Sequence, residues 1–326
     1  MTYTVLELFS GAGGLALGLE HAGFQLLKAI DNDKDSCATL KLNRPEWDVV
    51  CGDVQEMSYE GLTPDLVVGG FPCQSFSTAG LKRGFEDTRG TMFFELARCV
   101  KETRPKIVIG ENVKGLLSHD NGQTLNVILD TLASLGYRVK YKLLKAQNYD
   151  VPQKRERVII VGIRDDLDLD YTFPESLGTT VTLKEALADV PQSDGITYSE
   201  AKRKVLELVP PGGCWRDLPV DIQKSYMGAS YYQTGGRTGI ARRMSWDELS
   251  LTLTCSPSQK ISEKCHPSEV RPFTVREWAR IQTFPDSWQF VGSISSRYKQ
   301  IGNAVPVNFA YHIGKSVMDC LNKVSK

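Results

Sequence analysis

The first half of the chain contains short apolar segments that are each followed by glycine or by an acidic residue. These segments are residues 5–9, 25–30, 48–50, 66–68 and 105–110. Their length and apolar character are typical of strands buried in a sheet. Stretches with helical periodicity follow several of them, as at 15–22 and 91–103. The alternation predicts an α/β fold, doubly wound around a mostly parallel sheet.

The first two segments predict a nucleoside-binding site. The first leads into a glycine-rich turn at residues 10–14 (SGAGG) and then into a helix, so backbone can approach a ligand closely. Asp31 follows the second segment, where nucleotide-binding α/β folds place a carboxylate for ribose hydroxyls. The turn matches neither G-x-G-x-x-G nor a G-K-[ST] motif, so S-adenosylmethionine fits better than a dinucleotide or a triphosphate. A plain tight turn is the alternative.

The segment at 66–68 runs into residues 69–77 (GGFPCQSFS) and places Cys73 just beyond a strand end. Ligands of open α/β sheets bind at this edge, so Cys73 is a candidate nucleophile. A buried cysteine that acts as a small apolar side chain is the commoner case. The polar stretch 77–90 that follows is interpreted either as a loop that closes over a substrate or as an ordinary solvated loop.

Charged residues also lie at the ends of two predicted strands, after residues 105–110 and before residues 158–163. Glu111 comes directly after 105–110, where its carboxylate would face the same crevice, although a helix N-cap or a surface acid is an alternative. Residues 153–157 (QKRER) lead into a predicted strand at 158–163. Basic side chains entering a central strand can clamp an anion or a substrate, whereas a solvated charge run is the plainer interpretation.

The composition changes after Arg164. Residues 177–268 contain many Pro, Gly and Ser and only short strand-like pieces, which predicts a second, irregular domain. Its most basic segment, 235–243 (GGRTGIARR), resembles a surface that reads a DNA groove, or else is a loop with no partner. Thr274 and Glu277 have capping-box spacing and predict a helix that braces this domain. A last amphipathic helix is expected to end near Asn322.

The overall composition limits the classes of function. The 39 basic and 39 acidic side chains cancel, which neither indicates nor excludes nucleic-acid binding, because a local basic face is enough. The eight cysteines form no CxxC pair and the four histidines do not cluster with them, so no metal is expected. No signal peptide and no apolar run of roughly 20 residues is found. We therefore expect a cytoplasmic protein that does not enter a membrane.

Taken together, these motifs resemble the C5-cytosine-specific DNA methyltransferases of the bacterial restriction-modification type. The similar segments occur in the order that the family keeps and span nearly the whole chain: 9–15 (FSGAGGL), 70–74 (GFPCQ), 87–94 (DTRGTMFF), 111–113 (ENV), 153–157 (QKRER), 271–285 and 302–306 (GNAVP). One departure is Asn32, which stands where the family often has an aromatic residue. This weakens the expectation of stacking on adenine but not that of the ribose contact.

The resemblance implies a fold and a reaction. The fold is a Rossmann-like AdoMet-dependent methyltransferase domain, residues 1–176 and 298–326, with a smaller, irregular target recognition domain, residues 177–297. The final segment from Gln300 is expected to return to the glycine turn. In the implied reaction, Cys73 adds to C6 of a flipped-out cytosine in a specific DNA sequence. C5 then accepts the methyl group of S-adenosyl-L-methionine, a proton is lost and Cys73 is released.

The resemblance also implies site residues. The implied catalytic residues are Cys73, Glu111, Arg155 and Arg157. Arg155 is the expected neighbour of Cys73, and a protonated Glu111 would donate a hydrogen bond to N3 of the cytosine. The implied cofactor-binding residues are Phe9, Ser10, Gly11, Gly13, Gly14, Leu15, Asp31, Asn32, Asp53, Val54, Gly70, Pro72, Met92, Asn303 and Ala304. The implied DNA-binding residues are Gln74, Ser77, Lys82, Arg83, Arg89, Arg237, Arg242 and Arg243.

The implied partner is double-stranded DNA, methylated by a monomer that works in the cytoplasm and associates with the nucleoid while active. A cognate restriction endonuclease would act on the same site, so methylation would protect host DNA. Two alternatives remain, namely a tRNA cytosine-C5 methyltransferase of the same family and a catalytically silent DNA-binding protein. A nicotinamide oxidoreductase is disfavoured because the dinucleotide fingerprint is missing.

Overall fold

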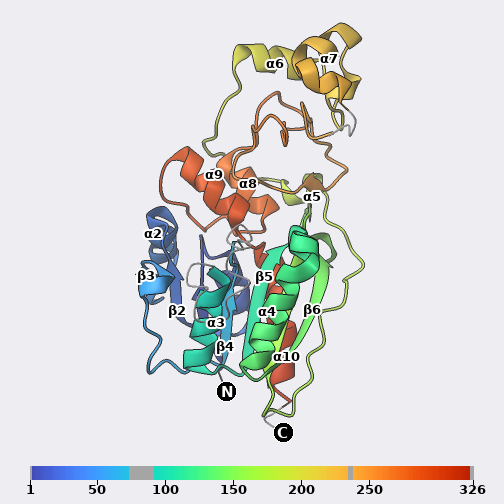
Figure 1. Cartoon of the computed structure of the whole chain (residues 1–326). Helices are drawn as coiled ribbons and strands as arrows, with labels where there is room; N and C mark the ends of the chain where they lie inside the picture. Colours follow the sequence, from blue (N-terminus) through green and yellow to red (C-terminus); the bar gives the residue numbers. More distant parts are fainter. Residues whose placement is uncertain (1, 73–91, 234–237, 324–326) are drawn as a thin grey trace.

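The computed structural model describes residues 2–72, 92–233 and 238–323. Its main feature is a seven-stranded sheet with the strand order β3-β2-β1-β4-β5-β8-β6. Both chain ends lie at the end of the molecule away from α6 and α7 (Figure 1). The α/β fold predicted from the alternation of apolar segments is confirmed.

The sheet is mostly parallel, as predicted. Its strands are β1 (Thr4–Leu8), β2 (Gln25–Asp31), β3 (Val49–Cys51), β4 (Leu66–Gly69), β5 (Ile107–Val113), β6 (Tyr137–Lys145) and β8 (Glu156–Arg164). β1 to β5 pair in parallel, and β8 is antiparallel to both β5 and β6. The carboxyl ends of β1, β2, β4 and β5 therefore meet at one edge.

One strand is longer than the apolar pattern predicts. β5 does not end at residue 110 but continues to Val113, because β8 keeps pairing with it there. In this register Glu111 lies opposite Ile159 and Val113 lies opposite Arg157. Glu111 is therefore part of the strand and does not follow it.

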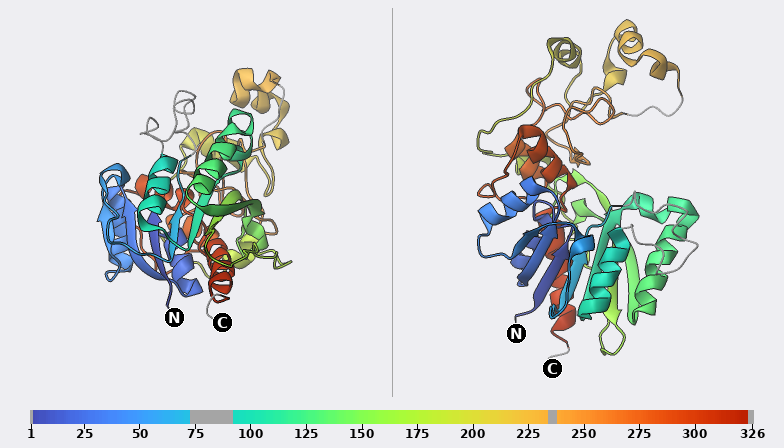
Figure 2. Two further views of the ribbon diagram at one scale, coloured as in Figure 1. Left: turned by 60° about the horizontal axis from the view of Figure 1, so that its bottom comes forward. Right: turned by 60° about the vertical axis from the view of Figure 1, so that its left-hand side comes forward.

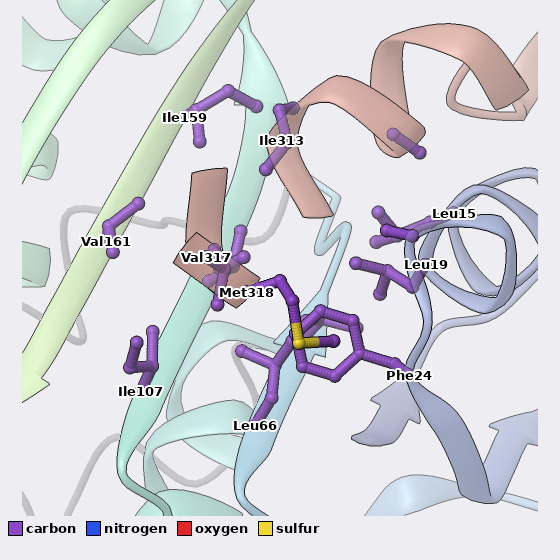
Figure 3. Close-up of a cluster of buried hydrophobic side chains, with 14 of the residues drawn as sticks. Leu15, Leu19, Phe24, Leu66, Ile107, Ile159, Val161, Ile313, Val317 and Met318 are labelled. Carbon is purple, nitrogen blue, oxygen red and sulfur yellow. The ribbon is translucent and has the colours of Figure 1, made fainter. Parts of the chain in front are cut away.

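Helices cover both faces of the sheet. They are α1 (Gly14–Ala22), α2 (Lys34–Asn43), α3 (Met92–Thr103), α4 (Gln123–Ser134) and α10 (Val307–Leu321). Successive strand residues point to opposite faces, so Val68 joins the core beneath α1 and α10 while Val67 joins the core beneath α3 and α4. Figure 3 shows the first of these cores, where Leu15 and Leu19 of α1 lie near Ile313 and Val317 of α10.

The middle of the chain forms short helices and loops. The helices are α5 (Leu183–Ala186), α6 (Glu200–Glu207), α7 (Val220–Met227), α8 (Val275–Ile281) and α9 (Ile294–Asn303). A two-stranded sheet joins β7 (Gln153–Lys154) to β9 (Ser250–Leu251). Single turns of 3-10 helix complete the structure: η1 (Val54–Glu56), η3 (Lys114–Leu117), η4 (His119–Gly122), η5 (Ala146–Asn148), η6 (Trp215–Asp217) and η7 (Gly228–Tyr232). The right-hand view of Figure 2 shows α6 and α7 far from the large sheet.

Two hydrophobic clusters bear on the predicted domain division. Residues of α6 and α7 have a small core of their own that includes Leu206, Trp215 and Met227. In contrast, α8 and α9 share a core with α1 and α2, in which Trp278 is fully buried. The predicted boundary at 297/298 falls inside α9. The capping box of Thr274 and Glu277 is present, but the helix it starts packs on the first domain as well as on the second.

None of the helices in the described ranges is both long enough and apolar enough to cross a bilayer.

Candidate functional site

A cavity of about 970 Å³ lies at the carboxyl ends of β1, β2, β4 and β5. Residues from all four strand ends line it, together with residues 252–255, 299–300 and 302–305. The segment from Gln300 does return to the glycine turn, because Gln300 and Ser10 line the same cavity. The strand ends that the sequence marks with glycine and acidic residues thus converge on one site.

The glycine turn forms one wall of the cavity. Phe9 and Gly11 both adopt positive φ, at 59° and 52°, which folds the chain back between β1 and α1. Gly14 begins α1, and a Cβ atom there would lie only 2.1 Å from the carbonyl oxygen of Val305. Glycine is therefore required at this position because the C-terminal segment passes directly against it.

Asp31 joins the end of β2 to this turn. One of its carboxylate oxygens accepts a hydrogen bond from the backbone N–H of Gly11 at 2.7 Å, and the other accepts one from Asp33 at 2.8 Å. Burial raises the pKa of Asp31, while these two N–H donors act in the opposite direction. The carboxylate is held in place at the cavity wall, and the exposed Asn32 lies beside it.

An ion pair connects two walls of the cavity. Lys299 of α9 places its Nζ atom 3.0 Å from the carboxylate of Asp33, which caps α2. Both residues line the cavity. Neither was a predicted site residue, because the contact joins segments that are far apart in the sequence.

Three buried polar atoms at the cavity have no hydrogen-bond partner within the described residues. They are Oε2 of Glu7, Oγ of Ser10 and Nε of Arg155. Glu7 is 1% exposed, and burial together with the charge of Asp31 raises its pKa well above the usual value. A buried polar group without a partner costs roughly 1–3 kcal/mol, so these atoms mark places where a ligand can bond. The sequence reading missed Glu7 because it lies inside an apolar strand segment.

Glu111 forms an ion pair with Arg157 at the same edge. Nε of Arg157 lies 2.7 Å from Oε1 of Glu111, and the two side chains are only 12% and 13% exposed. The neighbouring Asn112 donates a hydrogen bond from Nδ2 to the carbonyl oxygen of Phe71 at 2.8 Å. A Cβ atom on Gly70 would lie 3.2 Å from Oε2 of Glu111. The carboxylate is therefore packed against the segment that leads to Cys73.

Cys73 itself lies outside the described residues, so its distance to either arginine is untested. Arg155, the predicted neighbour of Cys73, lines the cavity. It is 2% exposed and donates to the carbonyl oxygens of Leu253, Gly302 and Ala304. Burial lowers the pKa of Arg155. The arginine placed against Glu111 is Arg157, and Arg155 instead holds the opposite wall together.

The predicted cofactor-binding residues divide into two groups. Those that line the cavity are Phe9, Ser10, Gly11, Leu15, Asp31, Asn32, Gly70, Pro72, Asn303 and Ala304. Those that do not line it are Gly13, Gly14, Asp53, Val54 and Met92.

The second group has other contacts that explain its position. Gly13 and Gly14 start α1 and face packed neighbours. Asp53 caps η1 by accepting a hydrogen bond from Gln55. Val54 belongs to the core under α3, and Met92 packs against that core. Within the described structure these residues shape the turn or fill the core, and their contact with the cofactor stays a prediction.

Most of the predicted DNA-binding residues lie outside the described residues, namely Gln74, Ser77, Lys82, Arg83, Arg89 and Arg237. The two that are described have contacts within the protein. Arg243 donates to the carbonyl oxygens of Val209, Pro267 and Ser268, and Arg242 pairs with Glu248 at 3.2 Å. Both guanidinium groups connect segments of the second domain, and their contact with DNA stays a prediction.

The second domain contributes cavity residues that the sequence did not reveal. They are Thr252, Leu253, Thr254, Cys255 and Gln259. The thiol of Cys255 lies 3.2 Å from Oδ1 of Asn303, which joins this loop to the 302–306 segment. No motif marks these residues, since long-range packing alone brings them to the cavity. Across the described ranges, no group of three potential metal ligands is found.

Comparison with known proteins identifies similar chains. Residues 3–319 match the family model described as C-5 cytosine-specific DNA methylase. The chain is 56% identical to the Type II methyltransferase M.Eco47II of Escherichia coli, over 99% of this chain and 81% of that protein. It is 51% identical to M.Sau96I of Staphylococcus aureus, over 98% and 77% of the two chains. A crystal structure of a DNMT2 variant from Spodoptera frugiperda, 18% identical, gives a TM-score of 0.69 over 97% of this chain and 100% of that one. That likeness concerns the fold alone.

Proposed function

The chain belongs to the C-5 cytosine-specific DNA methylase family, and on this premise we propose that its cavity binds S-adenosyl-L-methionine beside a cytosine taken out of duplex DNA. The protein is a DNA (cytosine-5)-methyltransferase. The observation that carries the proposal is the position of Glu111, held between Gly70 and Arg157 at the cavity that also contains Asp31.

The residues of the cavity fit this cofactor. Asp31 presents a fixed carboxylate suited to ribose hydroxyls, and Glu7 and Ser10 each have a buried oxygen without a partner. Burial raises the pKa of Glu7, so its carboxyl group can both donate a hydrogen bond to a ligand and accept one. When bound, the cofactor supplies an electrophilic methyl group. The glycine turn contains no lysine, which agrees with a ligand that has no phosphate.

The protein must make C5 of cytosine nucleophilic. We assign this to Cys73, whose thiolate forms a bond to C6 while a proton at the Glu111 carboxyl neutralises the charge that develops at N3. C5 then forms a bond to the methyl carbon as the bond from that carbon to the cofactor sulfur breaks, which leaves S-adenosyl-L-homocysteine. The proton at N3 returns to Glu111, and C5 loses its own proton to a base, for which water suffices. The C6–sulfur bond breaks, and the electron pair returns to the thiolate. Arg157 acts as a positioning residue because it fixes the Glu111 carboxyl.

The cytosine must leave the base stack before Cys73 can reach it, which costs a few kcal/mol. We propose that the middle of the chain, within residues 177–297, reads the flanking sequence. Its own small hydrophobic core supports this assignment, as does its position next to the cavity wall at 252–255. Arg242 and Arg243 remain proposed DNA-binding residues of this region, and without DNA their guanidinium groups bond within the domain.

A methyl-transfer assay tests the function. With radiolabelled S-adenosyl-L-methionine, we expect label in duplex DNA and none in tRNA. Bisulfite sequencing of the product should show protection of one cytosine within a fixed sequence. Label found only in tRNA would support the RNA-methylating alternative. The absence of transfer to any nucleic acid would support a silent binding protein.

We propose further that the enzyme is a monomer acting on cytoplasmic DNA, and that it protects DNA from a cognate restriction endonuclease. The names of its relatives as Type II methyltransferases support the protective role. DNA from cells that express the protein should resist an endonuclease that cuts the sequence found by bisulfite analysis. Complete cleavage of fully methylated DNA by every such endonuclease would contradict this role.

A further inference from the structure

Two cysteines with no part in the proposed reaction lie side by side next to β2. Cys37 is on α2 and is buried, whereas Cys51 is the last residue of β3 and is exposed. Cys51 pairs with Asp31 in the register of β2 and β3. The thiol of Cys37 donates to the carbonyl oxygen of the same Asp31 at 3.3 Å. The N–H of Gly52, the residue after Cys51, donates to that same carbonyl oxygen at 2.9 Å, so both cysteines lie next to one backbone atom of Asp31.

The two thiols differ in their access to solvent. A reagent can reach the exposed Cys51 from solvent, whereas Cys37 is 2% exposed and can be reached only through its neighbour. Burial and the adjacent Cys51 raise the pKa of Cys37 to about 12. The exposed Cys51 is therefore the thiol that a reagent in solution meets first, and thiolate is the reactive form toward disulfides.

We propose that Cys37 and Cys51 form a dithiol site that small-molecule disulfides, such as oxidised glutathione, convert to an internal disulfide. The Cys51 thiolate attacks one sulfur of the reagent, forms a mixed disulfide and releases one glutathione thiolate. Cys37 then loses its proton to solvent and attacks the Cys51 sulfur, and the second glutathione thiolate leaves. Two protein thiols are oxidised and one glutathione disulfide is reduced to two thiols.

The disulfide would connect the start of α2 to the end of β3. Both of these positions lie next to Asp31. The disulfide would remove the thiol donor from the Asp31 carbonyl, which also accepts a hydrogen bond from the N–H of Gly52 at 2.9 Å. The dithiol site does not depend on the proposed function, since neither cysteine lines the cavity.

The test uses the purified full-length protein, incubated with oxidised glutathione, blocked with N-ethylmaleimide and digested with trypsin. Trypsin cleaves after Lys41, between the two cysteines, so they fall in different peptides. The peptide with Cys51 also contains Cys73, so fragment spectra of the joined peptides must identify which of the two is bridged. Mass spectrometry should find these peptides joined by a disulfide, and the joined species should disappear on reduction. Persistence of glutathione on Cys51 without a bridge, or free Cys51 after incubation, would overturn the proposal.

Variants separate the two steps. Cys37→Ser should stop at the mixed disulfide on Cys51, and Cys51→Ser should leave Cys37 unmodified until the protein is denatured. Cys255→Ser is the matched control, because Cys255 is also exposed but is not paired with another thiol in the described structure. This control should form the bridge to the same extent as the parent. A bridge between Cys51 and any other cysteine would contradict the assignment, and this outcome is visible in the parent protein even where a variant fails to fold.

Discussion

The Nε atom of Arg157 lies 2.7 Å from Oε1 of Glu111, across the antiparallel pair β5 and β8. Both side chains are nearly buried, so neither can exchange its partner for water without cost. Breaking a buried ion pair by removing one partner costs about 3–5 kcal/mol, because it leaves the other charge uncompensated. This contact makes the position of the Glu111 carboxyl depend on Arg157.

Glu111→Gln should lower the rate of methyl transfer strongly while leaving DNA binding close to normal. Glutamine keeps the size of the side chain but cannot supply a proton to N3, and loss of general acid catalysis typically costs about 10²–10⁴-fold. Single-turnover methylation and a DNA-binding titration measure the two effects. A variant that transfers methyl groups at the parental rate would remove Glu111 from the mechanism.

Arg157→Met should destabilise the fold by about 3–5 kcal/mol, since it leaves Glu111 buried without its counter-charge. Adding Glu111→Gln to this variant should restore part of the loss, because the unpaired charge is then absent. Urea denaturation of the two single variants and the double variant measures the coupling. If the effects of the two changes simply add, the ion pair has no energetic role.

Glu7→Gln should change stability in a pH-dependent way. Burial raises the pKa of Glu7, so the folded protein keeps a proton that the unfolded chain releases. The parent is therefore most stable below the ordinary carboxyl pKa, and it loses stability as pH rises toward the folded pKa. Glutamine does not ionise, so the variant should gain stability relative to the parent as pH rises from about 5 to about 8.

Urea denaturation of the parent and of Glu7→Gln, at about pH 5 and at about pH 8 and without the cofactor, measures this difference in stability. Calorimetric titration with S-adenosyl-L-methionine should also show weaker binding to Glu7→Gln, since the variant lacks the carboxyl oxygen that faces the cavity. A stability difference that stays constant across this range would mean that Glu7 titrates normally.

Gly14→Ala should weaken both the fold and cofactor binding. The added Cβ would lie 2.1 Å from the carbonyl oxygen of Val305, so the 302–306 segment must move away from the glycine turn. Overpacking of this kind costs about 1–3 kcal/mol. Gly115→Ala is the matched control, because its Cβ would meet Val113 at an ordinary 3.8 Å. Equal melting temperatures for the two variants would contradict the close approach.

The parts of this structure that depend on local pattern could be predicted from the sequence. Apolar runs such as 66–68 give the strands, and the Thr274 and Glu277 capping box marks the start of α8. The extension of β5 through Glu111 could not be predicted this way, because it depends on pairing with β8, which comes much later in the chain.

The parts of the site that the sequence did not reveal have the same cause. Arg155 and Arg157 look equivalent in the sequence, but Arg155 lies between β7 and β8 and faces the 253 and 302–304 carbonyls. Glu7 has the position of an apolar strand residue, and the Asp33–Lys299 contact joins residues at opposite ends of the chain. Motifs identify which residues matter, whereas long-range packing decides which of them meet.

The central claim is that Cys73 attacks C6 of a cytosine beside Glu111. Duplex DNA containing 5-fluorocytosine at the methylated position tests it directly, because fluorine cannot leave C5 as the proton does and the bond to C6 then persists. With S-adenosyl-L-methionine present, mass spectrometry should find the DNA attached to the peptide that contains Cys73. Attachment to Cys255, the described thiol that lines the cavity, or the absence of any adduct, would contradict the account.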